Sequence, residues 1–224
     1  GAMTNLIHIP VNGKAFGRWS AGRGFKDEQA ALHALVIGVF GRDGIRSFRF
    51  HDGGQVFAIY GYSDLSAEGL VTRARMTAAP DVLDVIDLDG LRAKPMPEIP
   101  AGTRIGFDLR CCPTRRSMKG ERDAWAIEAA REGGADNAED AYLRWFSDRV
   151  SAASDVETFR VVRRQTAETS RKGRKIKLPD VTIQGTVLVK DAEAFEALMR
   201  GGVGRHASYG MGMLLLRPAD PEMI

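Results

Sequence analysis

Cysteine is nearly absent from this chain of 224 residues, which contains only the adjacent pair Cys111 and Cys112. Neighbouring strand residues point to opposite faces of a sheet, so the pair is not expected to form a disulfide bond. Two thiols also cannot complete a structural zinc site. We therefore expect buried or half-buried free thiols. The sequence shows no cluster of metal ligands, and we expect no bound metal and no other cofactor.

Long apolar runs are missing as well. No stretch approaches the roughly 20 residues that a membrane-spanning helix requires. The N-terminus lacks the basic region and apolar core of a signal peptide. With 44% apolar residues the chain can still bury a hydrophobic core, as one domain or as two small ones. We expect a soluble, cytoplasmic protein.

Standard phosphate-binding motifs are absent from the glycine-rich segment Gly201–Gly212, called here the glycine loop. No Lys-Ser or Lys-Thr pair follows it, which excludes a P-loop, and it does not open a helix after a strand, which excludes the dinucleotide fingerprint. Its glycines permit left-handed backbone and close approach to another chain. The apolar run Met213–Leu216 predicts a buried strand directly behind the loop. The pattern therefore indicates a loop with accessible backbone that is anchored by a buried strand.

The first part of the chain predicts the element order βαββαβ, which is the ferredoxin-like motif. Asp27 is a suitable N-cap and Gly41 a suitable stop for the first helix. Asp52–Gly54 is a suitable turn between two strands. The expected elements are a strand at 6–11, a connector at 18–26, a helix at 27–40, strands at 46–51 and 55–60, a helix at 66–76 and a strand at 82–88.

The same order is expected a second time after a linker at 92–100, which contains three prolines. The expected elements are a strand at 103–112, helices at 121–131 and 138–152, a hairpin of strands at 159–165 and 175–190, a helix at 191–199 and a strand at 211–216. We therefore predict an α+β fold of two tandem ferredoxin-like (βαββαβ, RRM-like) domains. The expected N-terminal domain covers residues 3–91 and the C-terminal domain residues 101–224.

Positive charge is concentrated in this expected hairpin, although the net charge of the chain is only +3. A basic segment on two strands is typical of nucleic-acid binding, and the alternative is a solvated loop or a general polyanion patch. We call this segment the basic hairpin. Its candidate RNA-binding residues are Arg160, Arg163, Arg164, Arg171, Lys172, Arg174, Lys175 and Lys177.

The sequence G-V-G-R-H-A-S-Y-G-M-G at 202–212, directly before the last apolar strand, resembles the signature glycine loop of the CRISPR repeat-processing proteins. The chain as a whole resembles their CasE branch (type I-E, RAMP superfamily). The resemblance implies that the loop lies in the second ferredoxin-like domain and positions RNA, and that the basic hairpin enters the groove of the repeat stem-loop. The implied RNA-binding residues of the loop are Gly202, Gly204, Arg205, His206 and Ser208.

His33 is the candidate catalytic residue implied by the same resemblance, because it lies on the first helix, before the apolar run Leu35–Phe40. Without the resemblance, a single helical histidine is an ordinary surface or structural residue. Arg23 and Lys26 are candidates to offset charge on the reacting phosphate, and Arg18 is a candidate RNA contact. The family often has a tyrosine one turn before the histidine, where this chain has Ala30, and a lysine in the loop, where this chain has Ala207.

The function implied is that of a metal-independent endoribonuclease that cleaves a CRISPR precursor transcript into guide RNAs. The attacking group is the ribose 2′-hydroxyl, and the products carry a 2′,3′-cyclic phosphate and a 5′-hydroxyl. The implied partners are the repeat stem-loop and the other subunits of a type I-E surveillance complex. Two alternatives remain: a stem-loop-binding subunit with little cleavage activity, and a tandem ferredoxin-like protein that binds a small molecule.

Overall fold

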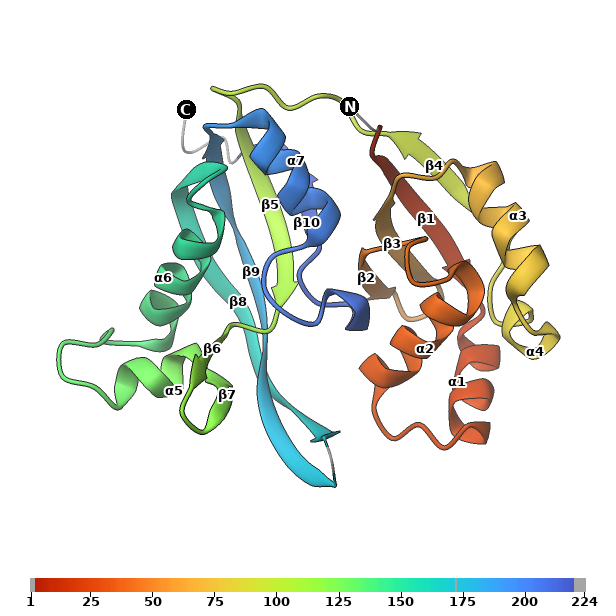
Figure 1. Ribbon diagram of the computed structural model, residues 1–224, viewed down its shortest axis with the longest axis horizontal. Helices are drawn as coiled ribbons and strands as arrows, with labels where there is room; N and C mark the ends of the chain where they lie inside the picture. Colours follow the sequence, from red (N-terminus) through yellow and green to blue (C-terminus); the bar gives the residue numbers. More distant parts are fainter. Residues whose placement is uncertain (1–2, 172, 220–224) are drawn as a thin grey trace. The chain divides into compact units, whose positions relative to one another are not determined.

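The computed structural model describes residues 3–171 and 173–219, and its chain forms two compact units (Figure 1). The first unit contains the chain up to Pro97 together with Ala207–Gly210. The second unit contains Glu98–His206 and the chain from Met211 onward. The glycine loop is therefore divided, with one short segment belonging to the first unit.

The first unit has the strand order β2-β3-β1-β4, with every neighbouring pair antiparallel. This is the order of a ferredoxin-like βαββαβ sheet. A short 3₁₀ helix, η1 (Ala207–Tyr209), packs on α2 and β2. The other elements are β1 (Asn5–Val11), α1 (Gly13–Gly22), α2 (Glu28–Phe40), β2 (Ser47–Asp52), β3 (Phe57–Ser63), α3 (Ala67–Thr77), α4 (Pro80–Leu83) and β4 (Arg92–Pro95).

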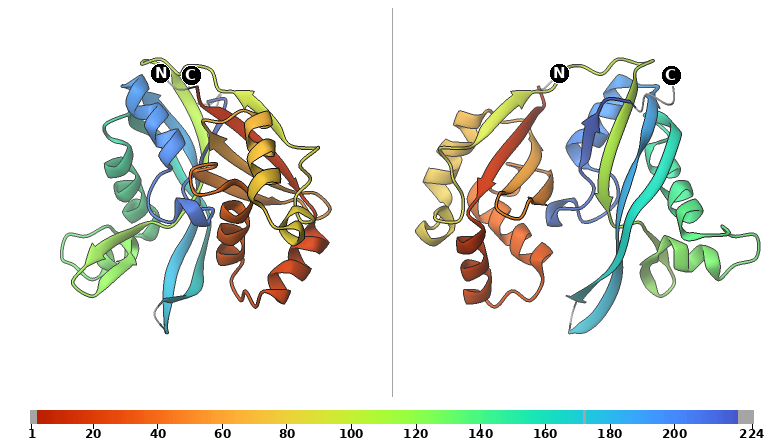
Figure 2. Two further views of the ribbon diagram at one scale, coloured as in Figure 1. Left: turned by 45° about the vertical axis from the view of Figure 1, so that its right-hand side comes forward. Right: turned by 180° about the vertical axis from the view of Figure 1, so that it is seen from behind.

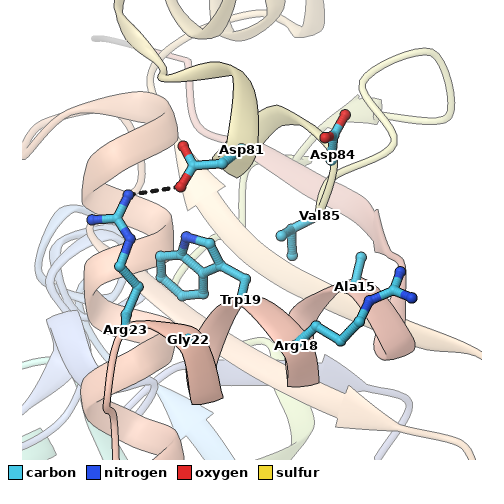
Figure 3. Close-up of a pocket in the computed structure, with 8 residues that line it drawn as sticks. All are labelled: Ala15, Arg18, Trp19, Gly22, Arg23, Asp81, Asp84 and Val85. Carbon is cyan, nitrogen blue, oxygen red and sulfur yellow. Dashed lines mark hydrogen bonds and ion pairs between the residues drawn. The ribbon is translucent and has the colours of Figure 1, made fainter.

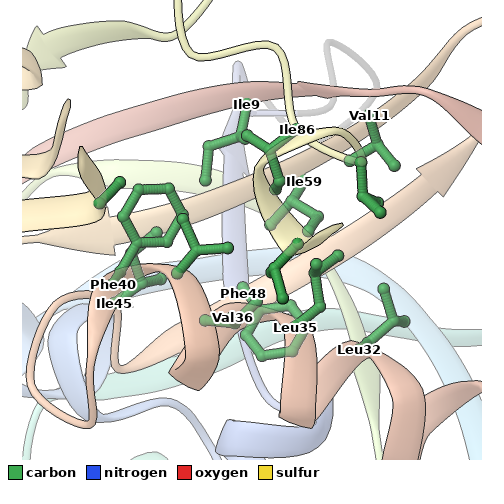
Figure 4. Close-up of a cluster of buried hydrophobic side chains, with 14 of the residues drawn as sticks. Ile9, Val11, Leu32, Leu35, Val36, Phe40, Ile45, Phe48, Ile59 and Ile86 are labelled. Carbon is green, nitrogen blue, oxygen red and sulfur yellow. The ribbon is translucent and has the colours of Figure 1, made fainter. Parts of the chain in front are cut away.

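Helix α2 supplies much of the core of the first unit (Figure 4). Its first turn is capped by Asp27, whose carboxylate accepts a hydrogen bond from the Gln29 amide at 2.9 Å, and Gly41 ends it with φ 77°. The expected helix at 27–40 is thus confirmed within one residue. Leu32, Leu35 and Val36 are buried together with apolar side chains of β1 and β3, so the helix position is fixed by the core.

Two expectations for the first unit are wrong. Arg18 does not lie in a connector, because Asn12 caps α1 and the helix runs to Gly22. The fourth strand is not at 82–88. Pro80 begins α4 instead, since its fixed φ suits the first helical turn. The strand β4 at Arg92–Pro95 pairs with β1 and occupies part of the expected linker, and Pro95 is tolerated because β4 is an edge strand.

The second unit repeats the ferredoxin-like order as β10-β5-β9-β8, with β6 and β7 forming a separate two-stranded sheet. Helices α6 and α7 cover one face, where Phe146 of α6 stacks on Phe107 of β5 and Phe195 of α7 is buried. The elements are β5 (Arg104–Cys111), β6 (Thr114–Ser117), β7 (Gly120–Asp123), α5 (Ala124–Ala129), α6 (Ala138–Val150), β8 (Ser154–Arg171), β9 (Arg174–Val189), α7 (Ala192–Gly201) and β10 (Leu214–Arg217).

The expected helix at 121–131 is wrong at its start, because Glu121–Asp123 belong to β7 and Asp123 caps the shorter α5. The expected hairpin is present and longer than predicted. Cys111 of β5 pairs with Val181 of β9, and the β8–β9 pairing continues from there to Arg171 and Arg174. The basic hairpin therefore extends past the end of β5 (Figures 1 and 2). No helix among the described residues has both the length and the apolar character needed to cross a membrane.

Candidate functional site

His33 lies in the second turn of α2 and is half-buried. Its imidazole stacks on the phenol ring of Tyr209 from η1, with ring centroids 4.0 Å apart and an interplanar angle of 4°. Gly210, directly after η1, has φ 85° and approaches the Phe48 ring so closely that an added Cβ would lie 3.0 Å from it. The backbone around Tyr209, which belongs to the first unit, is thereby packed closely against Phe48 of β2.

Tyr209 is the site residue that the sequence analysis missed. The residue is 36% exposed, and one face of its ring lies against His33, so the remaining surface is accessible to a ligand. One turn before His33, where the resemblance leads us to expect a tyrosine, this chain has Ala30. Tyr209 brings a phenol to the same histidine from a distant part of the chain. The only signal in the sequence was its place inside the glycine loop.

The three cations expected near His33 lie on α1 and the segment that joins it to α2. Arg18 and Arg23 line a cavity of about 410 Å³ between α1 and α4, whose other lining residues include Trp19 and Asp84 (Figure 3). Arg23 donates a hydrogen bond to Asp81 at 2.7 Å, and this bond holds the pKa of Asp81 below its usual value. Lys26 is exposed directly before the N-cap of α2.

At the base of the basic hairpin, Arg164 is fixed by contacts with Tyr142 and Asp123. Its Nε donates to the Tyr142 hydroxyl at 3.0 Å, and its guanidinium lies 3.6 Å from the Asp123 carboxylate. The guanidinium also lies over the Tyr142 ring, 5.8 Å from the centroid. The Arg164 side chain remains 45% exposed, so it is held in place and still accessible.

Arg163 is anchored on the sheet face opposite to α6 and α7. It donates to Gln165 at 3.0 Å, and Gln165 donates to Asp180 at 2.8 Å. Arg110 donates twice to Asp180, at 2.9 and 2.7 Å. Burial alone would raise the pKa of Asp180, but the hydrogen bonds from Arg110 and Gln165 hold it below its usual value. A buried carboxylate therefore organises this end of the hairpin. A second arginine of the hairpin is held in a similar way, since Arg160 donates a hydrogen bond to Gln184 at 2.9 Å.

Beyond this base the hairpin carries more exposed cations. Arg174, Lys175 and Lys177 are all exposed. The backbone of Arg171 pairs with that of Arg174. The side chain of Arg171 and the whole of Lys172 lie outside the described part of the chain. The described cations occupy both faces, because cross-strand partners share a face and strand residues alternate.

The glycine loop begins with Gly202 at φ 80° and Gly204 at φ 87°. A Cβ on Gly204 would lie 2.7 Å from the buried Trp145 ring, so only glycine fits. His206 has φ 68°, the one left-handed non-glycine residue in the described chain. Arg205, expected to contact RNA, lies 3.6 Å from Glu121. The backbone of Ser208 is in η1, and its side chain lies outside the described part.

His206 is part of a cluster that the sequence analysis did not anticipate. Its Nε2 lies 3.0 Å from Glu121 Oε1, and the ligand atoms of Cys112, Glu121 and His206 all lie within 4.8 Å of one another. Burial raises the pKa of the Cys112 thiol, and the Glu121 carboxylate raises it further. Both cysteines are buried and neither forms a disulfide bond, as expected. The expectation of no ligand cluster is wrong, because the fold brings together residues from three separate segments.

Two ferredoxin-like units in one chain define the protein as a tandem ferredoxin-like fold. Residues 6–218 match the model of the family described as CRISPR associated protein, and the chain belongs to this family. No curated protein matches the sequence.

Three solved structures illustrate the similarity of fold. The CRISPR endoribonuclease Cse3 bound to a 19-nt RNA is 17% identical, with 96% of this chain and 100% of that chain covered and a TM-score of 0.69. Cas6e from Escherichia coli str. K-12 is 18% identical, with 96% and 99% covered and a TM-score of 0.61. A chain of a CRISPR RNA-guided surveillance complex is 19% identical, with 96% and 99% covered and a TM-score of 0.59.

Proposed function

We propose that this chain is a metal-independent endoribonuclease that binds the stem-loop of a CRISPR repeat and cleaves the precursor transcript into guide RNAs. The observation that carries the proposal is the half-buried His33 imidazole, stacked on Tyr209, in a member of a CRISPR associated family. The similar structures include an endoribonuclease bound to RNA, which supports the same reaction class.

The reaction begins with the 2′-hydroxyl of the nucleotide before the cleaved bond. Its oxygen forms a bond to the adjacent phosphorus as the 2′ proton is removed, and the bond from phosphorus to the 5′ oxygen breaks as that oxygen receives a proton. The products are a 2′,3′-cyclic phosphate and a 5′-hydroxyl. His33 serves one of the two proton transfers, because a histidine exchanges protons near neutral pH.

Positive charge near the reacting phosphate would come from Lys26 and Arg23, because charge accumulates on the non-bridging oxygens in the transition state. Lys26 is exposed and adjacent to α2. Arg23 is ion-paired with Asp81, so it would have to exchange that carboxylate for a phosphate. We assign Arg18, the basic hairpin and the glycine-loop residues to RNA binding, mainly through phosphates, because the major groove of A-form RNA is too narrow for free reading of bases.

We also propose that the chain remains on its product and joins a surveillance complex in the cytoplasm. One similar chain is a component of a CRISPR RNA-guided surveillance complex, which supports this assignment. The partners would then be the guide RNA and the other subunits of the complex.

A second candidate function is a stem-loop-binding subunit with little cleavage. The observation that favours it is Ala30, which removes the tyrosine often found one turn before the family's histidine. The Tyr209 ring stacks on His33 and restrains its imidazole, which favours the first candidate.

The test is single-turnover cleavage of a repeat RNA from the protein's own genomic neighbourhood, in EDTA. A general acid or base contributes about a hundredfold to ten-thousandfold in rate. His33→Ala should slow cleavage by this amount with nearly unchanged RNA affinity. The matched control is His51→Ala, an exposed histidine of the same unit, which should cleave like the parent.

The substrate provides an independent control. An RNA with a 2′-deoxy group at the attacking position should not be cleaved by any variant. Cleavage of that RNA would show that water is the nucleophile and would rule out the proposed reaction. Tight binding without cleavage by the parent, in EDTA and in magnesium, would establish the second candidate.

A further inference from the structure

We propose that Cys112, Glu121 and His206 form a zinc site in the second unit, unrelated to the proposed cleavage chemistry. Cys112 directly follows β5, Glu121 lies in β7 and His206 lies in the glycine loop. One ligand atom of each residue lies within 4.8 Å of the other two. Zinc binds sulfur at about 2.3 Å and nitrogen or oxygen at about 2.0–2.2 Å, so tetrahedral ligand atoms are about 3.5 Å apart. Shifts of about 1 Å would close the site.

The ligand set favours zinc over other divalent ions. A thiolate and an imidazole are soft or borderline ligands that magnesium and calcium avoid, and a carboxylate completes a common zinc combination. Three protein ligands leave one position for water. Zinc would stabilise the fold here by joining the first part of the glycine loop to β5 and β7.

The surroundings hold the three side chains in place before a metal arrives. Thr114 donates a hydrogen bond to Glu121 Oε1 at 2.6 Å, and the Glu121 side chain is only 8% exposed. His206 adopts its left-handed φ of 68° while its imidazole faces Glu121. Cys112 is 3% exposed. The site is therefore enclosed, and its ligands are restrained by backbone and hydrogen bonds.

Binding would exchange existing interactions for metal bonds. The Cys112 thiol releases its proton to solvent as sulfur binds the ion. The hydrogen bond between His206 and Glu121 is replaced by two bonds to zinc. Arg205 lies 3.6 Å from the other Glu121 oxygen and is 42% exposed, so it can turn into solvent as the cation enters.

The test uses the full chain without a histidine tag, freed of metal by a chelator and titrated with Co²⁺. We expect one ion per chain, with the visible absorption of tetrahedral cobalt and the charge-transfer band of a cobalt–thiolate bond. Added Zn²⁺ should remove both signals. Cys112→Ser, Glu121→Gln and His206→Gln should each weaken binding more than about tenfold, since even indirect partners of a metal contribute 10–100-fold.

Cys111→Ser is the matched control, because Cys111 is adjacent and equally buried but lies outside the cluster. It should bind cobalt like the parent. Far-UV circular dichroism of each variant shows whether it folds, and the partly exposed His206→Gln decides the outcome if Cys112→Ser does not fold. Absence of the thiolate band, or binding that survives both Cys112→Ser and His206→Gln, would overturn the proposal. No RNA is used, so this result is independent of the cleavage assay.

Discussion

The imidazole of His33 and the phenol ring of Tyr209 are parallel within 4°, with centroids 4.0 Å apart. His33 comes from α2 and Tyr209 from η1, which belongs to the same compact unit. A stacked ring restricts rotation of the imidazole, so one of its nitrogens can be held toward a bound phosphate. Under the proposed function, Tyr209 is a positioning residue whose ring is more important than its hydroxyl.

Removing that ring should slow cleavage. An aromatic pair is worth about 0.5–1.5 kcal/mol beyond burial. If this energy holds His33 in its reactive orientation, Tyr209→Ala should slow single-turnover cleavage by between about twofold and tenfold. Tyr209→Phe keeps the ring and should cleave within about twofold of the parent, with the same pH–rate profile. A hundredfold loss in Tyr209→Phe would instead identify the hydroxyl as an acid or base.

The basic hairpin should contribute affinity and leave the bond-breaking step unchanged. Arg163, Lys175 and Lys177 are exposed. Removing one phosphate-binding cation reduces the salt slope of RNA binding by about 0.7–0.9. The variant with all three residues changed to alanine should therefore bind RNA more weakly, and its RNA affinity should depend less steeply on salt concentration. Its cleavage rate at saturating protein should stay near that of the parent. Fluorescence anisotropy at several salt concentrations measures the slope.

A charge-matched control separates this effect from the general loss of positive charge. Arg42, Arg75 and Lys94 are exposed residues of the first unit that we do not assign to RNA. Their triple alanine variant removes the same charge and should leave the slope nearly unchanged. Equal slopes for the two triple variants would contradict the assignment of the hairpin.

Elements with local signals could be predicted from the sequence. Asp27 and Gly41 mark the ends of α2, and Asp191 caps α7 through a hydrogen bond to the Ala194 amide. The prediction of a strand at 82–88 was wrong. Its first apolar residues belong to the helical turn that begins at Pro80, and Ile86 forms only an isolated bridge with Val11. The strands β6 and β7 could not be predicted, since their sequences TRRS and GERD contain no apolar alternation.

Within the candidate site, only the choice of His33 could be predicted from the sequence, because that choice depends on one residue and its neighbours along the chain. His33 could be selected through the family resemblance, because its helix and the following apolar run lie together in the sequence. Its stacking on Tyr209 and the cluster of Cys112, Glu121 and His206 depend on contacts between distant segments. Sequence patterns report neighbours along a helix or strand, and they do not report which loops the fold brings together.

The buried carboxylate of Asp180 should make stability depend on pH. Its pKa in the folded chain lies below the ordinary value of 3.8. Stabilisation from a lowered carboxyl pKa is complete above that ordinary value and is lost as the pH falls through the folded value. Asp180→Asn leaves Arg110 with a weakened partner and should cost about 3 kcal/mol at neutral pH. In urea unfolding, the difference in unfolding free energy between Asp180→Asn and the parent should become smaller once the pH falls below the ordinary carboxyl pKa.

Asp81→Asn is the exposed comparison. Asp81 also pairs with an arginine, Arg23, but both side chains are about half exposed, at 50% and 53%. Solvent screens such a pair, so this variant should unfold at nearly the same urea concentration as the parent. A difference between Asp180→Asn and the parent that does not change with pH would contradict the role of the ionised carboxylate.

The glycine loop should tolerate no side chain at Gly204. Its φ of 87° costs an L-residue roughly 1–2 kcal/mol. An added Cβ would also lie 2.7 Å from Trp145, whose Nε1 donates to the Thr114 carbonyl at 3.1 Å and holds the ring in place. Gly204→Ala should therefore destabilise the chain by roughly 2–5 kcal/mol in urea unfolding.

Gly201→Ala is the control, because Gly201 ends α7 with open space around its Cβ position. It should be neutral or stabilise by up to about 1 kcal/mol. Trp145→Phe removes the part of the ring that the new Cβ would meet, so it separates the clash from the backbone strain. The double variant Gly204→Ala with Trp145→Phe should be less destabilised than the sum of the single variants. Strict additivity would show that the backbone conformation alone requires glycine.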